Sequence, residues 1–281
     1  MSKTFPTVGL IGSVPHAGMF LSPAHALGVE LLFVADGKGS DVATVIDNSI
    51  PLSFVKGLEA DGVTVRPSFS AVSASSEKYG LIIDEQPTIC VMVARSPHGQ
   101  ATTWAPSEII RKNSLWVMSI TPAPLLSDSL QEKAQQLALE VSAQLGAVGV
   151  IAVEISVKDQ ELSVVKVEMH PHSSGNWTVD GAITSQYEQH LRAILDLPLG
   201  DPSITSRFVV TGNVYCGDKP NMYRPYLHLM ARTPAMKFHQ YKNSNEPGAL
   251  VGHLTLAGNN LEALIEEIEH AQQYMQGEID E

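Results

Sequence analysis

The chain has 281 residues, and its 30 acidic and 18 basic side chains give a formal net charge of −12 at neutral pH. Apolar residues make up 44% and charged residues 17%, a balance typical of a folded protein with a buried core and unlike that of a disordered one. The acidic excess argues against a nucleic-acid binder, because neutralising phosphates requires a basic face. At this length we expect one large domain or two to three small ones.

Cysteine content and apolar runs indicate where such a chain resides. Two cysteines, Cys90 and Cys216, are too few for a disulfide framework, so we expect buried free thiols. The segment Met1–Pro6 lacks the apolar core of a signal peptide, and no apolar run reaches the roughly 18 residues that a membrane span needs. These features predict a cytoplasmic protein with no membrane or nucleic-acid partner.

The N-terminal segment begins with a strand, a helix and a second strand. Residues 7–12 predict a buried parallel strand, and residues 29–34 predict a second strand that closes on Asp36. This order is typical of the first half of a Rossmann-like nucleotide-binding fold. The glycines of the segment do not have the G-x-G-x-x-G spacing, so the pattern does not indicate a dinucleotide site.

The remainder of the chain predicts strands interrupted by a few helices. Ser129 and Glu132 form a capping-box pattern before a helix over residues 129–145. Further helices are expected at 185–195 and 259–275. β-Branched and apolar runs predict strands at 88–95 and 115–120, which we expect to pair in antiparallel fashion. Further strands are expected at 148–157, 161–169, 207–215, 226–230, 236–240 and 252–256.

The strand at 149–155 carries one carboxylate, Glu154, whose burial without a partner would be costly. The following strand ends in Glu168, His170 and His172, which strand alternation places on one face. Two carboxylates on adjacent strands suit Mg²⁺ bound against nucleotide phosphates. An ion pair of Glu154 with a lysine or arginine, with the histidines capping the strand end, accounts for the same pattern. A transition-metal site of Glu168, His170 and His172 is a third interpretation.

Two segments after this strand carry a longer pattern. Residues 170–178 are H-P-H-S-S-G-N-W-T, and residues 184–193 are T-S-Q-Y-E-Q-H-L-R-A. They closely resemble R-P-H-N-S-G-H-W-T and T-S-Q-F-E-Q-H-L-R-A of the 5-(carboxyamino)imidazole ribonucleotide synthase family. That family is the ATPase subunit of phosphoribosylaminoimidazole carboxylase, within the ATP-grasp superfamily of purine biosynthesis. The resemblance covers residues 85–258 well and residues 7–70 faintly.

The resemblance implies an ATP- and Mg²⁺-dependent ligase that joins bicarbonate to aminoimidazole ribonucleotide through carboxyphosphate. Glu154 and Glu168 match the two strand carboxylates that bind magnesium in the family. The family's substrate loop matches His172, Ser174 and Gly175, and its phosphate-binding lysine matches Lys242. The implied cofactors are Mg²⁺ and ATP, and the implied partner is a small-molecule nucleotide ligand.

Several departures from the family pattern weaken the expected activity. Between residues 76 and 85 the family carries several dozen more residues, which include its glycine-rich phosphate loop and ATP-gripping lysines. A family arginine is replaced by His170, which cannot form bidentate contacts, and Ala249 and Leu250 replace two cations of a phosphate site. We therefore expect activity that is weakened or lost. The alternative is a non-catalytic paralogue, a pseudoenzyme that acts as a binding or assembly partner in the purine pathway, as a homodimer or with an enzyme of that pathway.

The expected fold is α/β (α+β) in three parts. Residues 1–60 form a Rossmann-like domain, and residues 61–84 are a linker at the deletion. Residues 85–200 form the large half of an ATP-grasp domain, incomplete because most of its small ATP-binding subdomain is missing. Residues 201–281 form a small C-terminal α+β domain.

Overall fold

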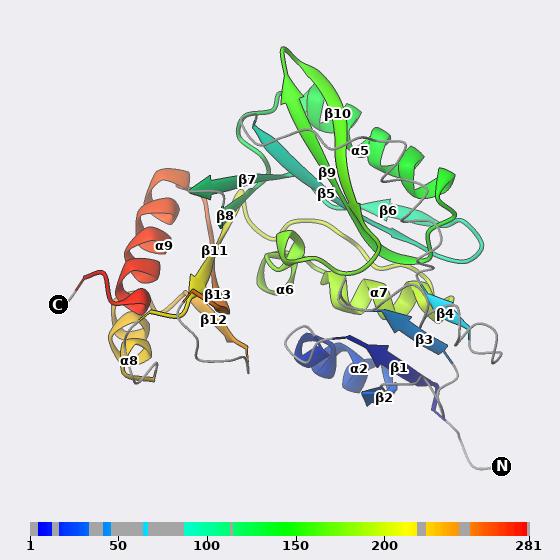
Figure 1. Ribbon diagram of the computed structural model, residues 1–281, viewed down its shortest axis with the longest axis horizontal. Helices are drawn as coiled ribbons and strands as arrows, with labels where there is room; N and C mark the ends of the chain where they lie inside the picture. Colours follow the sequence, from blue (N-terminus) through cyan, green and yellow to red (C-terminus); the bar gives the residue numbers. More distant parts are fainter. Residues whose placement is uncertain are drawn as a thin grey trace.

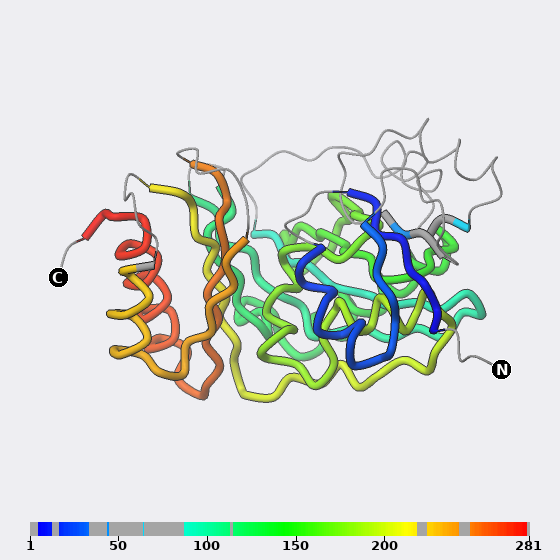
Figure 2. The backbone as a smooth tube through the Cα atoms, turned by 90° about the horizontal axis from the view of Figure 1, so that it is seen from below, coloured from blue at the N-terminus to red at the C-terminus, as the bar shows by residue number. Residues whose placement is uncertain are grey.

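The computed structural model describes residues 5–12, 17–33, 42–45, 64–66, 87–112, 115–217, 223–241 and 248–279. They form a mixed α/β structure with a small parallel sheet and a large antiparallel sheet (Figure 1). The small sheet and α7 lie towards one end of the molecule, and helices α8 and α9 lie at the other (Figure 2). Within the described ranges, no helix has the length and apolar character needed to cross a membrane.

The N-terminal sheet has the order β2-β1-β3-β4, and every pair in it is parallel. Its elements are β1 (Thr7–Ile11), α2 (Leu21–Leu27), β2 (Glu30–Phe33), β3 (Val42–Val45) and β4 (Val65–Arg66). Gly28 ends α2 in the left-handed conformation at φ 66°, which glycine adopts without steric cost. The predicted order of parallel strand, helix and second strand is confirmed.

The large sheet has the order β10-β9-β5-β7-β8-β11-β13-β12, with β6 on β5, and all its pairs are antiparallel. The expected antiparallel direction is confirmed, but the strands 88–95 and 115–120 do not pair with each other, because β7, which was not predicted, lies between them. Its strands are β5 (Thr88–Arg95), β6 (Ala101–Thr103), β7 (Ser107–Lys112), β8 (Leu115–Thr121), β9 (Gly149–Lys158), β10 (Glu161–Glu168), β11 (Phe208–Tyr215), β12 (Lys237–Gln240) and β13 (Leu250–Gly258).

Helices cover both faces of this sheet (Figure 1). They are α5 (Asp128–Gln144), α6 (Thr178–Gly181), α7 (Gln186–Ile194), α8 (Tyr223–Arg232) and α9 (Leu261–Gln276). Leu130 and Val141 of α5 pack against Ile151 and Val153 of β9, in one continuous apolar core. The N-cap of α5 is Ser127, whose Oγ accepts a hydrogen bond from the Leu130 N–H, so the capping box predicted at Ser129 is wrong.

One predicted strand is wrong. Residues 226–230 lie inside α8, where Leu229 is buried while Leu227 and Met230 are 65% and 51% exposed. A short apolar run does not distinguish a strand from a helix by periodicity, and here the one-sided burial of a helix accounts for the same residues.

The antiparallel sheet continues past residue 200, because β8 pairs with β11 and β11 pairs with β13. One sheet therefore includes strands from both 85–200 and 201–281, and the division into these domains stays a prediction. The linker predicted at 61–84 lies, apart from residues 64–66, outside the described residues.

His190 of α7 joins the two sheets. Its Nδ1 accepts a hydrogen bond from the Val150 N–H of β9 at 2.9 Å, so its Nε2 carries the proton and donates to Thr44 Oγ1 of β3 at 2.8 Å. Burial, with a smaller electrostatic effect of His170, lowers the pKa of His190 to about 3. The neutral ring thus makes one hydrogen bond to each sheet.

The buried His190 predicts a pH-dependent stability. The unfolded chain protonates this histidine below pH 6.5, whereas the folded chain holds it neutral down to about pH 3. The free energy of unfolding should therefore fall by about 1.4 kcal/mol for each pH unit below 6.5, through this group alone. Urea unfolding at pH 7, 6 and 5 would measure the slope. His190→Gln should flatten it, while the exposed control His25→Gln should not; equal slopes in all three proteins would contradict the prediction.

Candidate functional site

The two predicted carboxylates lie on one face of the large sheet. The register of β9 and β10 pairs Glu154 with Lys166 and Glu168 with Ala152, so the two glutamates are diagonal neighbours. Because side chains alternate along a strand, the two glutamates lie on one face of the sheet, and Ile151 and Val153 lie on the other face, towards α5. Glu154 is 8% exposed and Glu168 is 3% exposed, so both carboxylates are largely removed from water.

Cations neutralise both carboxylates. Arg111 of β7 donates from Nη2 to Glu154 Oε2 at 3.2 Å, and Lys166 forms an ion pair with Glu168. Burial lowers the pKa of the Lys166 ammonium, but its hydrogen bond to Glu168 and the nearby negative charge raise it overall. The ion-pair interpretation of Glu154 is therefore realised through Arg111, which the sequence analysis did not single out because β7 reaches this face only through sheet pairing.

The geometry gives the histidines a structural role. His170 Nδ1 hydrogen-bonds the Pro171 carbonyl oxygen at 2.9 Å, and its Nε2 lies 3.6 Å from Glu168 Oε2. His172 Nδ1 lies 2.9 Å from Ser174 Oγ. Over the part of the chain that the structure describes, no group of three His, Cys, Asp or Glu side chains could hold a metal ion. The alternative metal site of Glu168, His170 and His172 is therefore not formed.

The predicted substrate loop starts at His172, which caps the 3-10 turn η2 (Ser173–Gly175) by accepting a hydrogen bond from the Ser174 N–H. Ser174 Oγ lies 3.0 Å from the Sγ of Cys90 on β5, the residue paired with Glu154. Burial raises the pKa of the Cys90 thiol, and the Glu154 charge adds to the effect, so the thiol stays protonated. The loop and the carboxylates therefore meet at Cys90.

Gln186, at the start of α7, holds the loop in shape. Its Oε1 accepts from the His172 N–H at 3.0 Å, and its Nε2 donates to the His172 carbonyl at 2.8 Å and to Asn176 Oδ1 at 3.1 Å. A Cβ atom on Gly175 would lie 2.5 Å from Gln186 Oε1, so this close contact requires a glycine. The two segments that resemble the family, residues 170–178 and 184–193, thus contribute to one hydrogen-bonded unit.

This unit extends to the C-terminal strands. Asn176 accepts at Oδ1 from the Tyr187 hydroxyl at 2.7 Å and donates from Nδ2 to the Tyr241 hydroxyl at 2.8 Å. Tyr241 in turn hydrogen-bonds His253 Nδ1 of β13 at 2.6 Å. Burial raises the pKa of both Tyr187 and Tyr241, which keeps both hydroxyls protonated as donors. No local pattern signals the role of Tyr241, because the contact joins segments 65 residues apart.

Trp116 of β8 covers the loop. Its indole stacks on the His172 imidazole with ring centroids 5.5 Å apart and an interplanar angle of 16°. No local pattern in the sequence marks Trp116 as a site residue, because strand pairing brings it to the loop. The structure thus brings Glu154, Glu168, His172, Ser174 and Gly175 into one region, whereas Lys242, the predicted phosphate-binding lysine, lies outside the described residues.

Gln186 offers a direct test of how the loop is held. Gln186→Ala should lower the free energy of unfolding by about 1–3 kcal/mol, because it removes the partner of the part-buried His172 N–H and carbonyl and of the buried Asn176 Oδ1. Urea unfolding would measure the loss. Gln136→Ala, an exposed glutamine on α5, is the matched control and should change stability by less than about 0.5 kcal/mol. Equal effects of the two substitutions would show that Gln186 does not hold the loop.

Comparison with known proteins gives consistent matches. Residues 72–187 match the model of the ATP-grasp domain. The N5-carboxyaminoimidazole ribonucleotide synthase of Mycobacterium tuberculosis is 37% identical over 244 residues, which are 85% of this chain and 54% of that protein. The synthase of Mycobacterium leprae is 39% identical over 218 residues, 71% of this chain and 50% of that protein. The chain spans about half the length of these curated relatives.

Solved structures share the fold. The N5-carboxyaminoimidazole ribonucleotide synthetase of Thermus thermophilus has a TM-score of 0.81 at 21% identity, covering 98% of this chain and 99% of that one. The synthase of Aspergillus clavatus, in complex with ADP and 5-aminoimidazole ribonucleotide, has a TM-score of 0.84 at 19% identity over 98% and 99% of the two chains. The α/β class predicted from the sequence is confirmed at this level.

Proposed function

Given that this chain belongs to the ATP-grasp superfamily, as a shortened and divergent member of the N5-carboxyaminoimidazole ribonucleotide synthase family, we propose that it binds Mg²⁺ and ATP. It joins bicarbonate to the amine of aminoimidazole ribonucleotide at a reduced rate, while ATP is cleaved to ADP and phosphate. The observation that carries the proposal is the placement of Glu154 and Glu168 on one buried face beside the His172 loop. The adenine nucleotide and the ribonucleotide are the ligand classes named for the Aspergillus clavatus structure.

The chemistry of the residues supports magnesium. Mg²⁺ prefers oxygen ligands and is commonly held by one or two carboxylates together with substrate phosphates, whose charge it neutralises. Glu154 and Glu168 supply such oxygens on one face. Arg111 and Lys166 keep these carboxylates neutralised in the ligand-free protein, and they supply positive charge next to the phosphates when nucleotide binds.

The acceptor ribonucleotide is assigned to the loop of His172, Ser174 and Gly175, with Lys242 as the phosphate-binding lysine. The buried contacts of Gln186 and Asn176 support this assignment, because a loop fixed before binding loses less entropy when the ligand enters. In this arrangement the chain's own residues orient the ring amine towards the carboxylate face. The assignment of these residues and the oligomeric state, a homodimer or an association with a purine-pathway enzyme, are parts of the proposal.

Weakened turnover follows from lost positive charge. His170 is held by Glu168 and the Pro171 carbonyl, and Ala249 and Leu250 are uncharged. A charge-assisted contact is worth about 1.5–3 kcal/mol, so each lost contact lowers kcat/KM by about 10-fold or more. The sequence has few residues between 76 and 85 where the family has several dozen more, and this supports an ATP-grasp domain that lacks most of its small ATP-binding subdomain.

A second candidate function is a non-catalytic paralogue that binds the ribonucleotide or a pathway enzyme without turnover. The observation that favours it is that Arg111 and Lys166 already neutralise both carboxylates, so this face is satisfied without a metal ion. Adding ribonucleotide distinguishes the two candidates, since only the ligase releases ADP in response.

Release of ADP with ATP, Mg²⁺ and bicarbonate, measured with and without aminoimidazole ribonucleotide, tests the proposal. We expect release that rises when the ribonucleotide is added, with kcat/KM at least ~10-fold below that of a full-length synthase assayed in parallel. Glu154→Gln and Glu168→Gln should each lower the stimulated rate by about 100-fold or more, because each removes a magnesium-binding charge.

The control is Glu161→Gln, which changes an exposed glutamate on the same strand as Glu168 and should leave the rate unchanged. Absence of ribonucleotide-stimulated ADP release from the wild-type protein would refute the ligase. Retention of ribonucleotide binding in that case would establish the non-catalytic candidate.

A further inference from the structure

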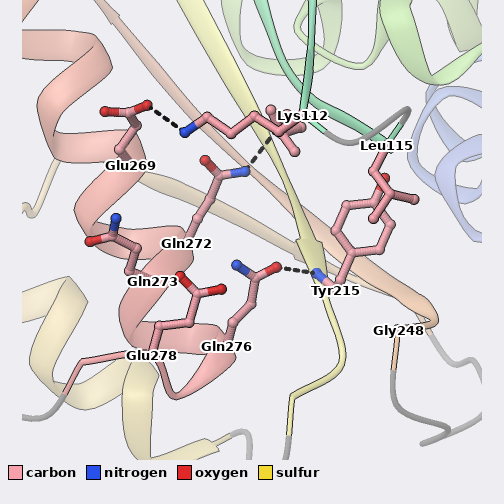
Figure 3. Close-up of a pocket in the computed structure, with 10 residues that line it drawn as sticks. Lys112, Leu115, Tyr215, Gly248, Glu269, Gln272, Gln273, Gln276 and Glu278 are labelled. Atoms are coloured by element: carbon pink, nitrogen blue, oxygen red, sulfur yellow. Dashed lines mark hydrogen bonds and ion pairs between the residues drawn. The ribbon is translucent and has the colours of Figure 1, made fainter.

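A slot of about 280 Å³ lies between α9 and the ends of β7, β8 and β11 (Figure 3). It is on the opposite side of these strands from the carboxylates. On β7, Arg111 contacts Glu154, whereas the next residue, Lys112, contacts Glu269 of α9. On β8, Trp116 stacks on His172, whereas Leu115 and Val117 on either side of it line the slot.

The two walls of the slot differ in chemistry (Figure 3). The strand side presents apolar surface from Leu115 and the ring of Tyr215, and α9 presents the carboxamides of Gln272 and Gln276. An aromatic ring and an aliphatic side chain suit the face of a flat molecule. Gln272 Nε2 already donates to the Val117 and Asn213 carbonyls, and Gln276 Oε1 accepts from the Tyr215 N–H. Gln272 Oε1 is left to accept, and Gln276 Nε2 to donate, a hydrogen bond at the edge of the ligand. A volume of about 280 Å³ is slightly below the usual range for ligand pockets and suits a ligand no larger than a nucleoside.

The net charge of the slot lining disfavours a phosphorylated ligand. The only cation among the lining residues that the structure describes is Lys112, whose Nζ lies 3.1 Å from Glu269 Oε1. Glu278 adds a second carboxylate, so the lining carries two negative charges against one positive charge. Phosphate and carboxylate groups are therefore repelled.

We propose that this slot is a second ligand site, separate from the carboxylate face, that binds an uncharged nitrogen heterocycle of nucleobase or nucleoside size. The inference goes beyond the proposed function and does not depend on it.

Hydrogen bonds connect the slot to the loop on the other face. Tyr215 donates its hydroxyl to the Trp116 carbonyl at 2.7 Å, and Gln272 Nε2 donates to the Val117 carbonyl at 2.8 Å. Both slot residues therefore hold the stretch of β8 from which Trp116 stacks on His172. A heterocycle that contacts Tyr215 and Gln272 changes the surroundings of Trp116, and the coupling between the two sites is reciprocal.

Isothermal titration with adenosine and with AMP tests the slot. We expect one adenosine to bind with a dissociation constant of about 0.01–1 mM and AMP to bind at least ~10-fold more weakly. Leu115→Trp, which fills the slot from a side chain that is 51% exposed, should abolish adenosine binding. Leu197→Trp, an exposed leucine just after α7, is the matched control and should not. Glu278→Lys should bring the dissociation constant of AMP closer to that of adenosine, because it replaces a negative charge in the slot with a positive one.

Two further measurements separate this site from the proposed nucleotide site. Glu154→Gln should leave adenosine binding unchanged, and adenosine should change tryptophan fluorescence in the wild type but not in Trp116→Phe, because Trp104 and Trp177 are fully buried elsewhere. Adenosine binding that survives in Leu115→Trp would overturn the proposal, and so would AMP that binds as tightly as adenosine. The absence of binding at 5 mM adenosine, about fivefold above the weakest dissociation constant expected, would also overturn it. Adenosine binding without any binding of Mg·ATP would leave the slot established and the proposed function refuted.

Discussion

Burial of two carboxylates on one sheet face is the constraint on which the site depends. An ionised carboxylate removed from water without a partner costs several kcal/mol, so Glu154 and Glu168 can be buried only with cations beside them. Arg111 and Lys166 meet that need from β7 and β10. The order of the strands, β10-β9-β5-β7, therefore brings together four charges that neutralise one another.

A second constraint is the network of polar groups behind the loop. The fully buried side chains of Asn176 and Gln186 have partners for their hydrogen-bonding groups in the His172 backbone and in the hydroxyls of Tyr187 and Tyr241. Because an unsatisfied buried polar group is costly, this network favours one loop conformation over others. It also makes the loop depend on strands from the last part of the chain, which is consistent with the uninterrupted sheet.

Local patterns predicted most of the elements, and pairings distant in sequence account for what they missed. The strands that carry Glu154 and Glu168 were predicted from their apolar and β-branched runs. The helix expected at 185–195 is α7, and the structure shows Ser185 as its N-cap. Arg111, Trp116 and Tyr241 reach the site through strand register or tertiary contact, which one sequence does not specify. The strand predicted at 226–230 failed because a short apolar run fits a helix equally well.

The central claim is that the Glu154 and Glu168 face is a magnesium-dependent nucleotide site. Titration of ATP into the protein with excess Mg²⁺, and again with EDTA, tests it most directly. The account predicts one site that binds at least ~100-fold more tightly with Mg²⁺, because Arg111 and Lys166 are already paired with the carboxylates and leave the added charge of the phosphates without a counterion when Mg²⁺ is absent. Equal affinity under both conditions, or no heat at millimolar nucleotide, would contradict it.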